Sequence, residues 1–235
     1  MATIVTVDNL TKKYGRKTAL ENISFKLEEG KVLGLLGPNG SGKTTLIKIL
    51  SAFHQKTSGR VEICGKEPGI ATKRLVSYLP DRNFLPKWMK IKDAKEYYND
   101  FFDDFNTETF REMIEVMKLS EDMKVKELSK GMQEKLNLSL TLSRDASLYL
   151  LDEPIGGVDP VARDMILNSI IDKAFQNKTL IVSTQLVRDI ESIFDEVMII
   201  NDGKILAHET VDNLRMEKSM SVEEFFKDCF GGVTC

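Results

Sequence analysis

The eight residues before Thr45 carry the clearest chemistry of the chain, and they read Gly37-Pro38-Asn39-Gly40-Ser41-Gly42-Lys43-Thr44. Closely spaced glycines let backbone N–H groups curl around an anion. A lysine at this spacing reaches the β- and γ-phosphates of a nucleotide, and the hydroxyl of the following threonine can bind Mg²⁺. The pattern therefore predicts a phosphate-binding loop that holds a nucleoside triphosphate.

The residues on either side distinguish this site from a chance glycine turn before a helix. Lys31–Leu36 is a short apolar run typical of a buried strand, and Thr45–Leu50 has the pattern of a helix. Strand, glycine loop and helix is the context that the motif requires. The start of such a helix also directs its positive end toward a bound phosphate. The flanks thus favour the phosphate-binding loop.

A second candidate site is the acidic pair Asp152-Glu153, which follows the apolar run Ser147–Leu151. In open α/β sheets, ligands bind at the carboxyl ends of the strands. Asp152 suits Mg²⁺, directly or through water, and Glu153 is placed to orient and deprotonate an attacking water. The alternative is a strand end followed by a capping acid. One acidic pair is a weak signal, but it becomes a strong one downstream of a phosphate-binding loop.

The elements that must position these residues alternate between strands and helices, which predicts a mostly parallel sheet covered on both faces. The expected further strands are Thr3–Val7, Ile23–Leu27, Gly59–Gly65, Arg74–Leu79, Lys178–Thr184, Glu196–Asn201 and Lys204–His208. The expected helices of the second half are Pro160–Lys173, Leu186–Ile193, Val211–Met216 and Ser221–Asp228.

A helical insert is expected after Pro80, because Ile91–Leu119 carries apolar residues at helical spacing among many charges. Its own core is the simplest explanation of the stripe Tyr97, Phe101, Phe105, Phe110, Met113, Ile114 and Met117. Trp88 and Met89, just before the insert, fit either a core or an exposed patch that faces a partner. A further helix is expected after Ser129, which is a plausible N-cap.

Composition bounds the class of protein. The chain has 235 residues, of which 42% are hydrophobic and 29% charged, as in an ordinary globular protein. A net charge of only −3 argues against nucleic acid as the main partner. Three scattered cysteines have no metal spacing and indicate a reducing compartment. Neither a signal peptide nor a bilayer-spanning apolar stretch is evident, so a membrane role is expected to come through a partner.

Tyr14 is expected in a polar loop, where it could stack on a purine base or pack on its own strand, and the residues alone favour packing. At this point a family can be recognised. The phosphate-binding loop, Leu128–Met132, the acidic pair and Gly157–Pro160 occur in an order and at distances that resemble the ATP-binding subunit of ABC transporters. The resemblance covers nearly the whole chain. The form Leu-Ser-Lys-Gly-Met is most similar to bacterial drug, peptide and lantibiotic exporters.

The resemblance implies a P-loop NTPase fold of α/β class, with a RecA-like sheet, an antiparallel β subdomain and a helical subdomain. The chain is then a single ABC ATPase domain, with a core of about 1–80 and 146–235 and a helical subdomain of about 81–145. It implies ATP and Mg²⁺ as cofactors. ATP is then hydrolysed in a head-to-tail dimer with a second ATP-binding subunit, which drives transport, in the direction of export, through a separate permease. Such a subunit is cytoplasmic and sits on the inner face of the cell membrane through the permease.

The resemblance also implies roles for residues that match the family's motifs. Tyr14 stacks on adenine, which reverses the preference for packing. Ser129 and the N–H of Gly131 contact the γ-phosphate held by the second subunit, and a capped helix start is a suitable anion site. Asp159 communicates across the same interface.

Two positions depart from the family pattern. Asp81 stands where the family usually has a glutamine that touches Mg²⁺, and an aspartate can still ligate the metal but is shorter and charged. Gln185 stands where the family usually has a histidine that contacts the γ-phosphate. The expected catalytic set is therefore Lys43, Glu153 and Gln185. A catalytic site with these residues is expected to be slower, to be differently tuned, or to be one half of an asymmetric pair of sites.

Two other functions remain as alternatives. A soluble ABC ATPase that acts on ribosomes or DNA usually carries two cassettes or a long coiled-coil insertion, and this sequence shows neither. A regulatory ATP-binding module with little turnover is compatible with the two departures, but the acid at Glu153 argues against it.

Overall fold

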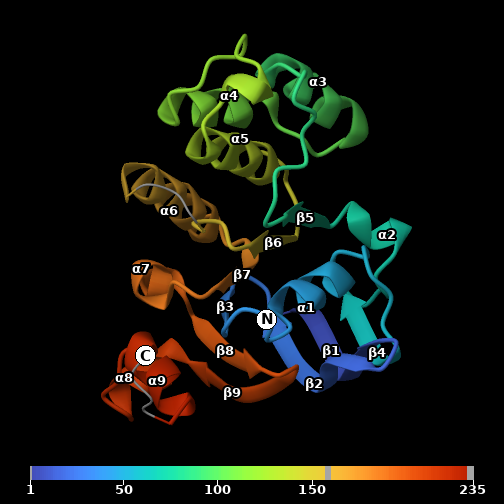
Figure 1. Ribbon diagram of the computed structural model, residues 1–235, viewed down its shortest axis with the longest axis vertical. Helices are drawn as coiled ribbons and strands as arrows, with labels where there is room; N and C mark the ends of the chain where they lie inside the picture. Colours follow the sequence, from blue (N-terminus) through green and yellow to red (C-terminus); the bar gives the residue numbers. More distant parts are fainter. Residues whose placement is uncertain (1, 157–159, 232–235) are drawn as a thin grey trace.

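The computed structural model describes residues 2–156 and 160–231 (Figure 1). Within these residues the larger sheet has six strands in the order β5-β6-β7-β3-β8-β9. All neighbours in it pair in parallel except β9, which runs antiparallel to β8. The strands are β3 (Val32–Leu36), β5 (Val76–Leu79), β6 (Leu148–Asp152), β7 (Thr179–Thr184), β8 (Glu196–Asn201) and β9 (Lys204–Thr210).

The central strands β3, β6 and β7 are buried along their whole length. Such continuous burial explains their near-continuous apolar sequences, because a parallel sheet is covered on both faces. Leu33 and Leu150 on one face pack with α1 (Lys43–Leu50) and with the smaller sheet. Tyr149 and Leu151 on the other face belong to the core formed with the remaining helices.

The smaller sheet is antiparallel, in the order β2-β1-β4, and lies on the α1 side of the larger one (Figure 1). Its strands are β1 (Thr3–Tyr14), β2 (Lys17–Glu28) and β4 (Ser58–Ile63). The expected short strands and polar loop are wrong here, because β1 and β2 form one long hairpin and Tyr14 is the last residue of β1. Several register shifts interrupt the pairing, and they hide the strand period in the sequence.

The helical insert contains α3 (Ile91–Phe101), α4 (Thr107–Val116) and α5 (Lys130–Leu142), which lie together at the top of Figure 1. Phe105 and Phe110 are buried as expected, but Tyr97 and Phe101 are 47% and 65% exposed, and Tyr98 packs inward instead. The expected stripe assumed one continuous helical spacing. It fails because α3 ends at Phe101 and α4 is a separate helix that starts after its own N-cap.

The two residues before the insert differ in their exposure to solvent. Trp88 is 70% exposed, whereas Met89 is buried. Ser129 is the N-cap of α5 as expected, since its hydroxyl accepts a hydrogen bond from the backbone of Met132 at 3.3 Å.

The remaining elements are a short unexpected helix α2 and the helices of the second half. They are α2 (Ile70–Lys73), α6 (Pro160–Phe175), α7 (Val187–Ile190), α8 (Val211–Met216) and α9 (Val222–Cys229), with 3₁₀ turns at Val125–Glu127 and Glu191–Ile193. The division into a core of about 1–80 and 146–235 and a helical subdomain of about 81–145 stays a prediction. None of the helices in residues 2–156 and 160–231 is long and apolar enough to cross a membrane.

Candidate nucleotide-binding site

The glycine loop after β3 fits its place only because it lacks side chains. A Cβ at Gly37 would lie 2.2 Å from the carbonyl oxygen of Ile200. A Cβ at Gly42 would lie 2.8 Å from Leu20 Cδ2, and its φ of 118° is one that residues with a side chain rarely adopt. The loop is thus pressed against the end of β8 and the beginning of β2.

The turn between β8 and β9 holds this loop in place. The backbone N–H of Gly203 donates to the carbonyl of Ser41 at 2.8 Å, and the Gly203 carbonyl accepts from the N–H of Glu21 at 2.8 Å. The dipeptide Asp202-Gly203 is typical of a hairpin turn, but its contact with the glycine loop is not evident from the sequence.

Lys43 opens α1 and is only 5% exposed. Its ammonium donates to the carbonyls of Gly37 at 2.7 Å and Pro38 at 3.1 Å, and lies 3.6 Å from Glu153 Oε1. Burial lowers the pKa of Lys43, and the charge of Glu153 acts in the opposite direction. The lysine therefore stands between the glycine loop and the acidic pair.

Asp152 is brought to α1 by the order of the strands. Ser183 on β7 is its partner in register, and the Ser183 hydroxyl donates to Asp152 Oδ1 at 2.6 Å. The hydroxyl of Thr44 donates to the same oxygen at 3.2 Å. Burial raises the pKa of Asp152, and these two hydrogen bonds lower it in part.

The oxygens of Asp152 and Thr44 fit a magnesium ion. Oδ2 of Asp152 is buried and has no hydrogen-bond partner among the residues that the structure describes. Mg²⁺ prefers hard oxygen ligands such as carboxylate and hydroxyl, and usually takes only one or two from the protein. The predicted metal residues Thr44 and Asp152 are thus together.

Glu153 follows directly, and its backbone is left-handed, with φ of 52°. The Ser183 hydroxyl accepts from the N–H of Glu153 at 3.1 Å. Both carboxylate oxygens are buried, and neither accepts a well-formed hydrogen bond from the described part of the chain. Burial raises the pKa of Glu153, while Lys43 and the nearby backbone amide of Gln185 lower it in part. A strained acid with a raised pKa is typical of a general base.

A cleft of about 460 Å³ joins the glycine loop, Lys43, Thr44 and Glu153, whereas Asp152, which Thr44 contacts, is not part of its lining. The predicted residues Tyr14, Asp81 and Glu153 line it, and so does the glycine loop. Its full lining is Tyr14, Lys17, Thr18, Ala19, Asn39, Gly40, Ser41, Gly42, Lys43, Thr44, Thr45, Asp81, Glu153, Asp202 and Gly203. Tyr14 is 43% exposed, with the Lys12 ammonium 4.6 Å from its ring centroid.

Other predicted residues lie elsewhere or cannot be placed. The side chain of Gln185 is exposed and just follows β7, whose last residue Thr184 pairs with Leu36 before the loop. Ser129 is exposed and Gly131 half-buried, and neither lines the cleft in the part of the chain that is described. Asp159 lies outside the described residues.

The sequence did not single out Ser183 or the segment Lys17–Ala19. A signal for Ser183 was present, because it is a small polar residue within the apolar run of β7. Lys17–Ala19 carries no such signal, because it reaches the cleft through the β1–β2 turn.

Comparison with known proteins identifies the family. Residues 20–156, more than half of the chain, match the protein family described as ABC transporter. The chain is a member of the ABC transporter family. It is an ATP-binding subunit of this family and an ATPase, with the P-loop NTPase fold, so the expected family, enzyme class and fold class are confirmed.

Individual relatives agree with the family. An uncharacterized ABC transporter ATP-binding protein of Methanocaldococcus jannaschii is 32% identical over 89% of this chain and 79% of its own length. The lantibiotic transport ATP-binding protein SrtF of Streptococcus pyogenes is 29% identical over 94% of this chain and 95% of its own length. Among solved structures, a dimeric ATP-binding cassette in a post-hydrolysis state with ADP and Pi superposes with a TM-score of 0.78. It is 20% identical, over 88% of this chain and 98% of the other.

Proposed function

We propose that this ABC ATPase binds Mg-ATP in the 460 Å³ cleft and hydrolyses it in a head-to-tail dimer with a second ATP-binding subunit. The hydrolysis drives export through a separate membrane permease. The observation that carries the proposal is the meeting of Lys43, Thr44, Asp152 and Glu153, from α1 and the end of β6, at one edge of the sheet.

Binding follows from the lining of the cleft. The exposed ring of Tyr14 stacks on adenine, and the N–H groups of the glycine loop with the Lys43 ammonium hold the phosphates. Thr44, Asp81 and Asp152 hold Mg²⁺, which when bound offsets the negative charge of the phosphates.

For hydrolysis, Glu153 takes the proton of the attacking water. Its raised pKa suits this role, because a stronger base accepts a proton more readily. The side-chain amide N–H of Gln185 donates a hydrogen bond that stabilises the charge developing on the transferring phosphoryl group. Its place just beyond β7, with its backbone amide near Glu153, supports this assignment.

The second subunit is needed because part of the expected site lies away from the cleft. Ser129 and Gly131 stand at the start of α5, and Ser129 is exposed. A helix start is an anion site, and in a head-to-tail pair this one contacts the γ-phosphate bound by the other subunit. The dimeric state of the similar cassette supports this arrangement.

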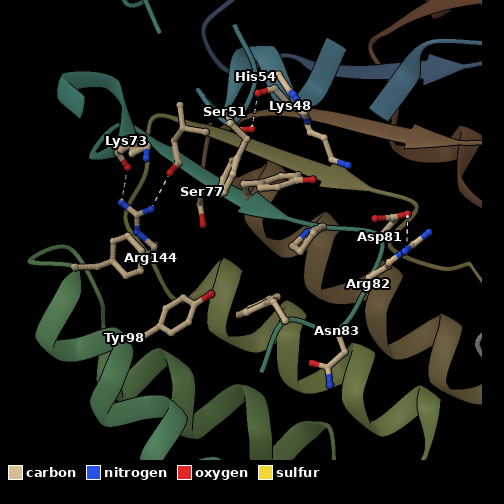
Figure 2. Close-up of a pocket in the computed structure, with 16 residues that line it drawn as sticks. Lys48, Ser51, His54, Lys73, Ser77, Asp81, Arg82, Asn83, Tyr98 and Arg144 are labelled. Carbon is tan, nitrogen blue, oxygen red and sulfur yellow. Dashed lines mark hydrogen bonds and ion pairs between the residues drawn. The ribbon is translucent and has the colours of Figure 1, made fainter. Parts of the chain in front are cut away.

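The permease docks in a groove of about 650 Å³ between the sheet and the helical insert (Figure 2). Aromatic side chains of Phe53, Phe84, Tyr98 and Phe102 line it, and Trp88 stands 70% exposed on the segment that leads from the groove into the insert. An apolar groove with an exposed aromatic beside it suits an amphipathic segment of a partner. This contact holds the subunit at the cytoplasmic face of the membrane. The transport named for the lantibiotic relative supports export.

The test is the ATPase rate of the complex that copurifies with the chain. Lys43→Ala removes the buried cation of the loop and should abolish ATP binding or turnover nearly completely. Lys227→Ala is the matched control, because that lysine pairs with Glu223 on the exposed side of α9. Copurification of a membrane protein supports transport, whereas a soluble complex with ribosomes or DNA contradicts it. Unchanged nucleotide affinity and turnover in Lys43→Ala would refute the assignment of the loop.

A further inference from the structure

Tyr78 is a polar residue near the metal site that the roles above do not use. It lies on the edge strand β5 and is the register partner of Leu150 on β6. Register partners in a parallel pair direct their side chains to the same face of the sheet. Leu150 lies on the α1 face, and Asp152, two residues later, lies on that face too. Tyr78 is therefore a diagonal neighbour of Asp152.

The hydroxyl of Tyr78 is buried and has no hydrogen-bond partner in the described part of the chain. The same holds for Oδ2 of Asp152. Burial raises the pKa of Tyr78, and the charges of Asp152 and Asp81 raise it further. A neutral O–H donor and a carboxylate oxygen thus lie on the same face of two neighbouring strands, and neither has a partner among the described residues. Buried polar groups are rarely left in this way without a reason.

The ring of Tyr78 is part of the lining of the groove of Figure 2. Its centroid is 5.5 Å from that of Phe53, which is 66% exposed. Lys48 lies one helical turn after Thr44 and also lines the groove, and its charge reaches Asp152 and lowers the pKa of that residue. Figure 2 shows Lys48 extending from α1 along the same side of the groove as Asp81. Asp81, a predicted metal ligand, lines both this groove and the nucleotide cleft, so the two hollows meet at that residue.

We propose that Tyr78 is a positioning residue of the metal site, whose hydroxyl donates a hydrogen bond to Asp152 Oδ2, directly or through one water, when the metal binds. The hydrogen bond holds the carboxylate in the orientation that the metal needs, and the contact with Phe53 holds the ring. This inference rests on the proposed Mg-ATP site. Partners of this kind orient metal ligands, and losing one typically costs about 10–100-fold in metal affinity.

The test measures the affinity for Mn²⁺, as a probe of the Mg²⁺ site, in the presence of a non-hydrolysable ATP analogue. Free Mn²⁺ is followed by electron paramagnetic resonance. Tyr78→Phe removes only the hydroxyl, and should weaken Mn²⁺ binding about tenfold. The affinity for the analogue without metal should remain that of the wild type, because Tyr78 does not line the nucleotide cleft.

Tyr149→Phe is the matched control. Tyr149 lies on the neighbouring strand β6 but on the opposite face, where its hydroxyl donates to the carbonyl of Arg144. This variant should lower the melting temperature and leave the Mn²⁺ affinity unchanged.

A third variant separates this inference from the proposed function. If Asp152→Ala does not weaken Mn²⁺ binding, the metal site itself is wrong. If Asp152→Ala weakens it while Tyr78→Phe stays within twofold of the wild type, the role of Tyr78 is overturned and the metal site stands. An equal loss in Tyr78→Phe and Tyr149→Phe also overturns it, because the effect would then be one of general stability.

Discussion

Asp152 and Glu153 are adjacent acids with different surroundings. Asp152 is fully buried and accepts hydrogen bonds from Ser183 and Thr44, which hold its carboxylate in one place. Glu153 has a left-handed backbone, and its carboxylate lies near Lys43 and lines the cleft. One strand end thus supplies both a candidate metal ligand and a candidate base.

The departure at Gln185 leads to a prediction about turnover. An amide N–H stabilises developing charge on the phosphoryl group by a neutral hydrogen bond, which alanine cannot form. Gln185→Ala should lower the ATPase rate of the complex at least about tenfold, which corresponds to about 1.4 kcal/mol. Gln185→His should preserve or raise the rate, because a histidine donates the same bond and becomes charged when protonated.

Steady-state turnover of wild type and both variants, with partners present, tests this role. An alanine variant that matches the wild type from about pH 6 to pH 8 would remove Gln185 from the catalytic set.

At the scale of single residues, the sequence predicts the positions of side chains that belong to a short motif. The loop residues, Thr44 and Asp152 meet as expected because strand, loop and helix fix their relative positions. Ser183 was missed because its role depends on which strand lies beside β6, and the spacing of residues along the chain does not contain that order. The roles of all the site residues, those of the cleft as well as Ser129, Gly131, Asp159 and Gln185, stay predictions.

Among the elements, one buried arginine connects the helical insert to the sheet. Arg144 is 3% exposed and forms two hydrogen bonds with the carboxylate of Asp104, at 2.9 and 3.0 Å. It also donates to the carbonyl of Val76 on β5 at 2.7 Å, and its guanidinium lies 4.0 Å from the ring centroid of Phe102. Figure 2 shows this side chain at the edge of the groove, near Lys73.

Removing this side chain should destabilise the protein. Arg144→Ala removes the hydrogen bonds to the Asp104 carboxylate and the β5 carbonyl, and because Asp104 is partly exposed, the loss should cost about 1–3 kcal/mol. For a chain of this size, each 1 kcal/mol lowers the melting temperature by roughly 2–4 °C. Thermal unfolding followed by circular dichroism is the measurement. Arg111→Ala is the control, because Arg111 is exposed and pairs with Glu108 on the surface of α4. Equal melting temperatures for both variants would contradict the role of Arg144.

The segment between β5 and α3 should contact the permease. Trp88→Cys, in a chain whose native cysteines are replaced by serine, should crosslink to a cytoplasmic loop of the copurified membrane protein. Met216→Cys is the control, because Met216 is 82% exposed but lies on α8, which Figure 1 places at the opposite end of the molecule. Crosslinks from position 216 alone would show that the docking surface is elsewhere.

The elements that the sequence predicted well are those with one environment along their length. β3, β6 and β7 are buried throughout, and their apolar runs identify them. The β1–β2 hairpin was underestimated because register shifts break its alternation. The inward face of α3 was misassigned, since helical spacing continued past the end of the helix at Phe101.

The whole molecule separates two groups of residues that the family uses on one nucleotide. The cleft with Lys43 and Glu153 lies at the edge of the sheet, whereas Ser129 stands exposed at the start of α5 in the helical insert. In the proposed head-to-tail pair, the cleft of each subunit would face the start of α5 of the other subunit.

The Glu153→Gln variant allows the proposed head-to-tail dimer to be measured. It keeps the shape of the side chain but removes the base, so ATP should remain unhydrolysed between two subunits. Two further changes in this background act on different halves of the site. Lys43→Ala disables the loop, and Ser129→Arg places a bulky side chain at the start of α5.

Sedimentation velocity with Mg-ATP is the most direct measurement, with the copurifying ATP-binding subunit added if the pair is mixed. The Glu153→Gln chain should sediment as a dimer with Mg-ATP and as a monomer with ADP. Each double variant alone should stay monomeric, whereas an equal mixture of the two should recover dimer, because one intact site forms when the defects fall on the other. A Glu153→Gln chain that stays monomeric at high concentration, with its partners present, would contradict the shared site.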